Sequence, residues 1–150
     1  MLTTRDQILA RLADLDIEVA THDHPPVYTV EEARRHTHHL PGGHCKNLFL
    51  KDKKGRLWLV TCLDERQLDL NALSRRLGAA RFSLGRAELL REVLGVEPGA
   101  VTPLAIANDA EGRVTHVLDR GLLAHGGLVN CHPLRCHPLA AAARDNSRQP

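Results

Sequence analysis

The chain has 150 residues, 43% of them hydrophobic, and a net charge of +2, which favours one domain with a substantial apolar core. It has no apolar run of about 18 residues and no basic-then-apolar leader, so we expect neither a membrane span nor secretion. Without a leader, the cysteines favour reduced thiols and a cytoplasmic location. The four are Cys45, Cys62, Cys131 and Cys136.

The first part of the chain predicts helix, strand and helix. Apolar residues recur with helical spacing from Thr4 to Leu15, with Thr3 or Thr4 as the cap. Residues 17–21 alternate as a strand does and end before Pro25-Pro26. Thr29 can cap a short helix that runs to about His36.

The middle and the end of the chain predict hairpins between further helices. Strands are expected at 44–51 and 57–63, helices at 69–77 and 86–94, and strands at 103–108, 113–119 and 127–131. This order lacks a regular βαβ rhythm, so it favours an α+β fold with a mixed, mainly antiparallel sheet flanked by helices. We expect one domain over residues 1–139 and a disordered polar tail over 140–150.

Positive charge gathers in residues 34–56, where seven lysines and arginines face one acid. Such a cluster can contact a phosphate backbone, although a solvated turn explains part of it equally well. Aromatic residues make up only 3% of the chain, which argues against stacking of many bases and favours a short contact. The candidate phosphate-binding residues are Arg34, Arg35, Lys51, Lys53, Lys54 and Arg56.

One lysine stands out because of its position after a glycine pair. In a strand, Lys46 shares a face with Leu48 and Leu50, which places its ammonium at the edge of an apolar cleft. A cation in such a place favours an anionic or carbonyl ligand. The alternative is an ordinary strand-end lysine whose stem lies on apolar surface while its charge stays in water.

A glycine-x-x-x-proline loop, Gly99–Pro103, precedes an expected strand that carries Ala105 and Ala107. Such a loop can direct backbone N–H groups at a carbonyl oxygen, as an oxyanion hole does, although most such loops are simple turns. His132 either contacts a substrate, as donor or base, or is bonded to backbone at a strand end. Cys45 is expected to be buried and inert, and the Cys-x4-Cys spacing at 131–136 argues against zinc.

Several blocks in order resemble the YbaK/ProX family of aminoacyl-tRNA editing domains, and most closely its freestanding ProX type. The resemblance covers roughly residues 20–134. Its blocks are His24–Ala33, His39–Asp52, Gly55–Val60, Leu94–Leu104 with Asn108-Asp109, and Asn130–Leu134. After Leu134 the chain departs from the family pattern, which continues with a threonine-rich strand and an amphipathic helix.

The resemblance implies a hydrolase that deacylates mischarged tRNA(Pro), above all Ala-tRNA(Pro), without a cofactor. It implies catalytic roles for Lys46, Gly99 and His132. The implied substrate contacts are Val27, Tyr28, Asn47, Ala100, Val101, Thr102, Pro103 and Asn108. The expected partner is the tRNA acceptor end, bound by a monomer or weak homodimer. Alternatives are deacylation of Cys-tRNA(Pro) or another small aminoacyl-tRNA, and a non-catalytic module that binds the acceptor stem.

Overall fold

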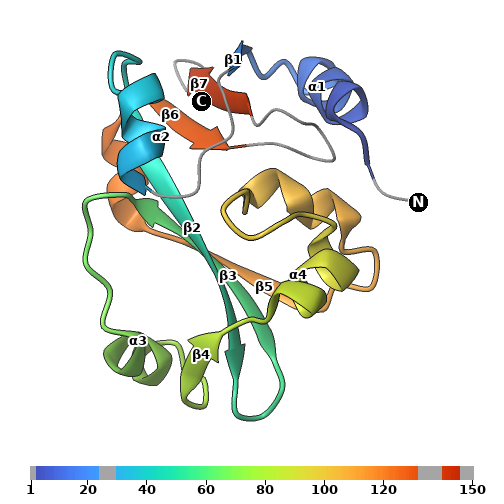
Figure 1. The fold of residues 1–150 in the computed structure, drawn as a ribbon, viewed down its shortest axis with the longest axis vertical. Coiled ribbons are helices and arrows are strands. Elements are labelled where there is room, and N and C mark those ends of the chain that lie inside the picture. Colours follow the sequence, from blue (N-terminus) through green and yellow to red (C-terminus); the bar gives the residue numbers. More distant parts are fainter. Residues whose placement is uncertain (1–2, 24–29, 132–139, 146–150) are drawn as a thin grey trace.

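The computed structural model describes residues 3–23, 30–131 and 140–145, which form one mixed sheet with helices on both faces (Figure 1). The sheet order is β1-β7-β6-β2-β3-β5, with β4 also paired to β2. The strands are β1 (Val19–Asp23), β2 (Gly43–Asp52), β3 (Leu57–Leu63), β4 (Phe82–Leu84), β5 (Val114–Leu118), β6 (Gly127–Cys131) and β7 (Ala140–Asp145).

Most strand pairs are antiparallel, which confirms the predicted α+β class. The pairs β1–β7, β6–β7, β2–β3 and β2–β4 are antiparallel, while β2–β6 and β3–β5 are parallel. The helices are α1 (Arg5–Asp14), α2 (Val30–Thr37), α3 (Leu70–Arg76) and α4 (Ala87–Leu94), with 3-10 helices η1 (Pro103–Asn108) and η2 (Arg120–Ala124). Within the described ranges, every helix is too short or too polar to cross a membrane.

Local sequence signals set the ends of three helices. Thr4 accepts a hydrogen bond from the Gln7 N–H, and Gln7 bonds back to the Thr4 N–H, which makes a capping box at the start of α1. Asp69 accepts from two N–H groups at the start of α3. Gly95 ends α4 in the left-handed conformation, with φ of 67°. These caps confirm the predicted helix positions.

The β2–β3 hairpin is the centre of the molecule because both of its faces are covered. On one face, Phe49, Leu57 and Leu59 pack with α4 and η1. On the other face, Leu50 and Trp58 belong to a cluster that includes residues of α3 and β4. The alternation of side chains in a strand therefore sends neighbouring residues of β2 into two different environments.

The predicted strand at 103–108 is wrong, since this segment forms the 3-10 helix η1. Thr102 caps it by accepting a hydrogen bond from the Leu104 N–H, and Pro103 occupies its first turn, where a missing N–H costs nothing. Ala105 is buried in this helix. The short strand β4 was not predicted, because three residues leave little periodicity to recognise.

Residues 140–145 form β7, in a segment where the composition suggested a disordered tail. This strand lies between β1 and β6 and pairs with both. Backbone hydrogen bonds to two neighbours supply this order, and the local composition, four alanines followed by Arg144 and Asp145, does not reveal such long-range pairing. The domain boundary at residue 139 stays a prediction.

Candidate active site

Gly42 and Gly43 allow the start of β2 to lie close to the start of β6 and to His125. Gly42 has a φ of 113°, and a Cβ atom there would lie 2.5 Å from the carbonyl oxygen of Gly127. A Cβ at Gly43 would lie 2.9 Å from the His125 ring. Only glycine suits the positive φ of Gly42, and the close approach of the His125 ring leaves no room for a side chain at Gly43. The pair therefore fixes where β2 starts, and with it the position of Lys46.

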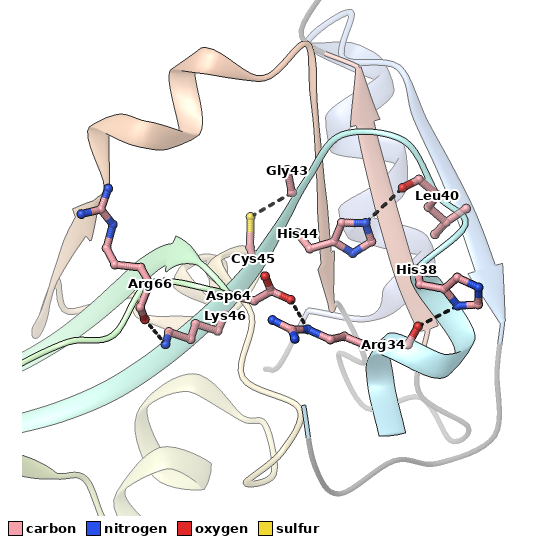
Figure 2. Close-up of polar contacts among 9 residues, drawn as sticks. All are labelled: Arg34, His38, Leu40, Gly43, His44, Cys45, Lys46, Asp64 and Arg66. Carbon is pink, nitrogen blue, oxygen red and sulfur yellow. Dashed lines mark hydrogen bonds and ion pairs between the residues drawn. The ribbon is translucent and has the colours of Figure 1, made fainter. Parts of the chain in front are cut away.

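Lys46 points along one face of β2 towards a backbone carbonyl group. Its Nζ donates a hydrogen bond to the Arg66 carbonyl oxygen, while the Arg66 guanidinium points away from it (Figure 2). That guanidinium pairs with Asp119 at 2.6 Å. In the strand register Lys46 lies opposite Cys62. The ammonium is thus directed at a carbonyl oxygen of the chain itself, and the predicted contact of Lys46 with a ligand stays a prediction.

A groove of about 960 Å³ lies next to these residues. Val60 and Cys62 contribute from β3, and α3 with its preceding loop faces β5 and η2 across the groove. Arg66, Arg76 and Arg120 place positive charge in its lining. Lys46 lies beside the groove through its cross-strand neighbour Cys62 and its contact with Arg66. The catalytic role of Lys46 stays a prediction.

Asn47 points to the opposite face of β2 and holds the Gly99–Pro103 loop. Its Nδ2 donates to the Val101 carbonyl oxygen at 3.2 Å, while its Oδ1 accepts from the Thr61 hydroxyl at 2.7 Å. The structure therefore brings Asn47 and the loop together, and it places Lys46 on the other face. A substrate that uses all three must contact groups on both faces of β2.

Local contacts also fix the conformation of the Gly99–Pro103 loop. Gly99 has a φ of 85°, the Ala100 N–H donates to the Glu97 carbonyl oxygen at 3.0 Å, and Ala100 and Thr102 are buried. The Ala100 amide is therefore engaged in the turn that leads into the loop. Any oxyanion hole would have to use other N–H groups of this segment.

Asn108 serves the packing of three separate segments. Its Oδ1 accepts from the Thr3 N–H at 2.7 Å, and its Nδ2 donates to the Leu94 carbonyl oxygen at 2.8 Å. The amide thus ties the start of α1 to the end of α4. A contact between Asn108 and substrate stays a prediction, and it would compete with these two hydrogen bonds.

The basic residues of segment 34–56 fall into two groups at opposite ends of β2. Arg34 and Arg35 lie on α2 beside the start of β2, whereas Lys51, Lys53 and Lys54 are exposed at the hairpin end (Figure 1). Nine strand steps separate these ends, roughly 30 Å. Arg34 pairs with Asp64 at 2.9 Å, which raises the pKa of Arg34 chiefly through the hydrogen bond. A single short ligand cannot contact both groups.

Arg56 belongs to the hairpin turn as a structural residue as well as a candidate phosphate ligand. Its guanidinium bonds Asp52 at 2.9 Å and lies over the Trp58 ring, 5.7 Å from the centroid. Asp52 is buried and also accepts from the N–H groups of Lys54 and Arg56. A phosphate at Arg56 would have to share it with Asp52.

Cys45 and Cys62 are poorly suited to act as nucleophiles. Burial raises the pKa of Cys45 to about 12, and burial also raises the pKa of Cys62. A thiol attacks as its thiolate, so both side chains are unreactive near neutral pH. Cys45 is only half-buried, less than the sequence suggested, but the prediction that it is inert agrees with this pKa. Among the described residues, no three His, Cys, Asp or Glu side chains gather as metal ligands.

Three predicted site residues lie outside the described part of the chain, namely Val27, Tyr28 and His132. Conversely, sequence reasoning missed Thr61, which contacts Asn47, and His116, which contacts Thr61. Thr61 left one visible signal, since it is the single hydroxyl in the otherwise apolar strand Leu57–Leu63. No comparable signal marks His116 in the sequence, because its contact with Thr61 depends on the order of β2, β3 and β5.

Comparison with known proteins identifies the class of protein. Residues 24–139 match the family model described as an aminoacyl-tRNA editing domain. The chain therefore belongs to the aminoacyl-tRNA editing domain family.

Two curated relatives show the range of this similarity. The chain is 48% identical over 139 residues to prolyl-tRNA synthetase associated domain-containing protein 1 of Danio rerio, covering 93% of this chain and 73% of the relative. It is 32% identical over 133 residues to the prolyl-tRNA editing protein ProX of Acetoanaerobium sticklandii, covering 88% and 80% of the two chains.

Solved structures share the fold. The hypothetical protein APE2540 superposes with a TM-score of 0.72 at 20% identity, over 93% of this chain and 89% of that one. A candidate trans-editing enzyme for prolyl tRNA synthetase superposes with a TM-score of 0.68 at 20% identity, over 98% and 90%. At this identity the likeness concerns the fold alone, and it agrees with the mixed, mainly antiparallel sheet.

Proposed function

We propose that this protein is a trans-editing hydrolase that deacylates mischarged tRNA(Pro) in the cytoplasm, with Ala-tRNA(Pro) as its preferred substrate. The observation that carries the proposal is the family match over residues 24–139. The relative named as a prolyl-tRNA editing protein supports the choice of tRNA. In the reaction, water adds to the ester carbonyl carbon, the bond to the terminal ribose oxygen breaks, and that oxygen takes a proton.

In this proposal the substrate lies at the start of β2. N–H groups of the Gly99–Pro103 loop stabilise the negative charge that develops on the carbonyl oxygen. Lys46 holds a phosphate or carbonyl oxygen at the terminal adenosine. That oxygen takes the place of the Arg66 carbonyl, which accepts from Lys46 in the present structure. Asn47 supports the loop through Val101.

A positioned water is a better candidate for the attacking group than the Cys45 thiol near the site. The pKa of about 12 keeps the nearby Cys45 thiol protonated, so it cannot attack the ester at neutral pH. We propose that the vicinal hydroxyl of the ribose and backbone groups orient the attacking water. No cofactor enters this proposed reaction.

A deacylation assay with Ala-, Cys-, Ser- and Pro-tRNA(Pro) tests the proposal. We expect the fastest release from Ala-tRNA(Pro), slower release from the Cys and Ser forms, and almost none from the Pro form. Fastest release from Cys-tRNA(Pro) would change the substrate but keep the reaction. Binding of tRNA(Pro) without release of any amino acid would contradict the proposed reaction, and it would indicate an acceptor-stem-binding module.

A further inference from the structure

Three adjacent strands place three polar side chains in one line across the sheet. Asn47 of β2 lies directly opposite Thr61 of β3. His116 of β5 pairs with Leu59, two residues before Thr61 on β3, and therefore faces the same side of the sheet as Thr61. The Thr61 oxygen lies 2.7 Å from Asn47 Oδ1 and 2.9 Å from His116 Nε2. The line ends at the Gly99–Pro103 loop, where Asn47 Nδ2 meets the Val101 carbonyl oxygen.

The direction of each hydrogen bond follows from which atoms can donate. The Val101 carbonyl only accepts, so the Asn47 amide must turn its Nδ2 towards it and its Oδ1 towards Thr61. Oδ1 cannot donate, so the single Thr61 hydroxyl proton lies on the bond to Asn47. His116 Nε2 must then carry a proton and donate to the Thr61 oxygen. The arrangement therefore requires one tautomer of the neutral His116 ring.

We propose that Thr61 and His116 are positioning residues, which orient the Asn47 amide and thereby hold the Gly99–Pro103 loop in its active conformation. This inference rests on the proposed deacylase function of that loop. Reversal of the Asn47 amide would set two acceptors, its Oδ1 and the Val101 carbonyl, against each other. The network prevents this reversal, because Oδ1 is held by the Thr61 proton.

The surroundings favour a fixed network over a mobile one. Thr61 is 1% exposed and lies within the central strand β3, so its hydroxyl has little access to competing water. Burial lowers the pKa of His116, which keeps the ring neutral near pH 7 and makes its tautomer a defined property. The hydrogen bonds run from His116 to Thr61 and from Thr61 to Asn47, so both residues act on the loop through Asn47.

The tautomer can be measured directly, without any activity. Nitrogen NMR of the full chain, labelled with 15N-histidine, distinguishes the protonated ring nitrogen from the bare one. We expect the neutral His116 ring to carry its proton on Nε2, and the Nε2 resonance to shift in Thr61→Val, where the acceptor of this proton is gone. A proton on Nδ1 in the unaltered protein would overturn the proposal.

Substitutions test whether the network affects catalysis. Thr61→Val keeps the shape but removes the hydroxyl, and we expect kcat for Ala-tRNA(Pro) to fall about 10- to 100-fold with little change in KM. Thr61→Ser should stay within about threefold, because the hydroxyl remains. The matched control is Thr115→Val, the same change at an exposed position of β5, which should leave kcat unaltered. Equal kcat values for Thr61→Val and Thr61→Ser would overturn the proposal.

A second pair of variants guards against loss of folding. His116→Gln keeps an N–H donor and should retain more activity than His116→Leu; equal losses would contradict the proposed donation to Thr61. If the unaltered protein releases no amino acid, the proposed function fails on its own. The positioning role is then decided by the Val101 and Thr102 amide resonances. They should shift in Thr61→Val and stay in place in Thr61→Ser and Thr115→Val, and their immobility in Thr61→Val would overturn the inference.

Discussion

Lys46 is the residue on which the proposed reaction depends most. We predict that Lys46→Ala abolishes Ala-tRNA(Pro) hydrolysis and leaves the fold intact. The reason is that the side chain is only partly buried and its hydrogen bond to the Arg66 carbonyl lies at the surface. Loss of such a hydrogen bond costs about 1 kcal/mol of unfolding free energy.

The measurement is single-turnover deacylation beside a thermal melt of each variant. Arg75→Ala removes the same charge from the exposed face of α3 and serves as the control, with unchanged deacylation. A folded Lys46→Ala protein that still hydrolyses Ala-tRNA(Pro) at the normal rate would remove Lys46 from the site.

Asp52 is the buried acid that closes the turn of the β2–β3 hairpin. Burial alone would raise its pKa, but hydrogen bonds from the Arg56 and Lys54 N–H groups and the Arg56 guanidinium outweigh burial and lower it. A lowered pKa stabilises the fold above the unfolded value of about 3.9, and this contribution is lost as the pH falls through the folded pKa. The stability of the β2–β3 turn should therefore depend on pH.

We predict that Asp52→Asn lowers the melting temperature at neutral pH and that its difference from the unaltered protein shrinks below about pH 4. Melts across that range measure this difference. Glu111→Gln, at an exposed position in the loop after η1, should show little difference at any pH. A constant difference for Asp52→Asn from about pH 7 to about pH 3 would show that its charge does not stabilise the turn.

The β2–β3 hairpin also carries the prediction about tRNA binding at the element scale. Lys51, Lys53 and Lys54 are exposed near its tip, roughly 20 Å from Lys46 along the strand, which an acceptor stem can span. Replacing all three by alanine should flatten the slope of log affinity against log salt by about 0.7–0.9 for each phosphate that a lysine no longer neutralises. Filter binding of tRNA(Pro) at several salt concentrations measures this slope.

Arg11→Ala, an exposed change on α1, is the control for a simple loss of charge, and it should leave the slope unaltered. If the lysine variant keeps the original slope, the tRNA contact lies elsewhere. The groove arginines Arg66, Arg76 and Arg120 are then the next candidates.

How well the sequence predicts an element depends on whether its signal is local. The helices α1, α3 and α4 carry their own stop or start residues, Thr4, Asp69 and Gly95, and they lie where predicted. The segment 103–108 alternates like a strand, yet Thr102 and Pro103 turn it into a 3-10 helix. β7 is ordered by two distant partners, which no window of sequence contains.

At the scale of the whole molecule, some parts of the candidate site have a local sequence signal, whereas others depend on how distant strands pair. The glycine pair, Lys46 and the Gly99–Pro103 loop are visible as short motifs. That Lys46 and Asn47 face different sides of β2 follows once the strand is recognised. The network of Thr61 and His116 could not be predicted from the sequence, because its contacts depend on the order of β2, β3 and β5 and on the register of both pairings.

The proposed pocket accepts alanine and rejects proline. A site sized for a methyl group excludes the pyrrolidine ring by steric clash, whereas one methyl or hydroxyl group changes binding by only about 1–3 kcal/mol. We therefore predict strong exclusion of Pro-tRNA(Pro) and leaky selection among small residues, with alanine the best substrate.

The most direct test compares kcat/KM for Ala-tRNA(Pro) and Pro-tRNA(Pro) with one enzyme preparation. Both substrates have the same tRNA, so only the aminoacyl group differs and tRNA binding cancels. We predict rapid hydrolysis of the alanyl ester and a prolyl rate close to that of the uncatalysed reaction. Hydrolysis of both esters at similar rates would contradict this prediction and would indicate a general aminoacyl-tRNA deacylase.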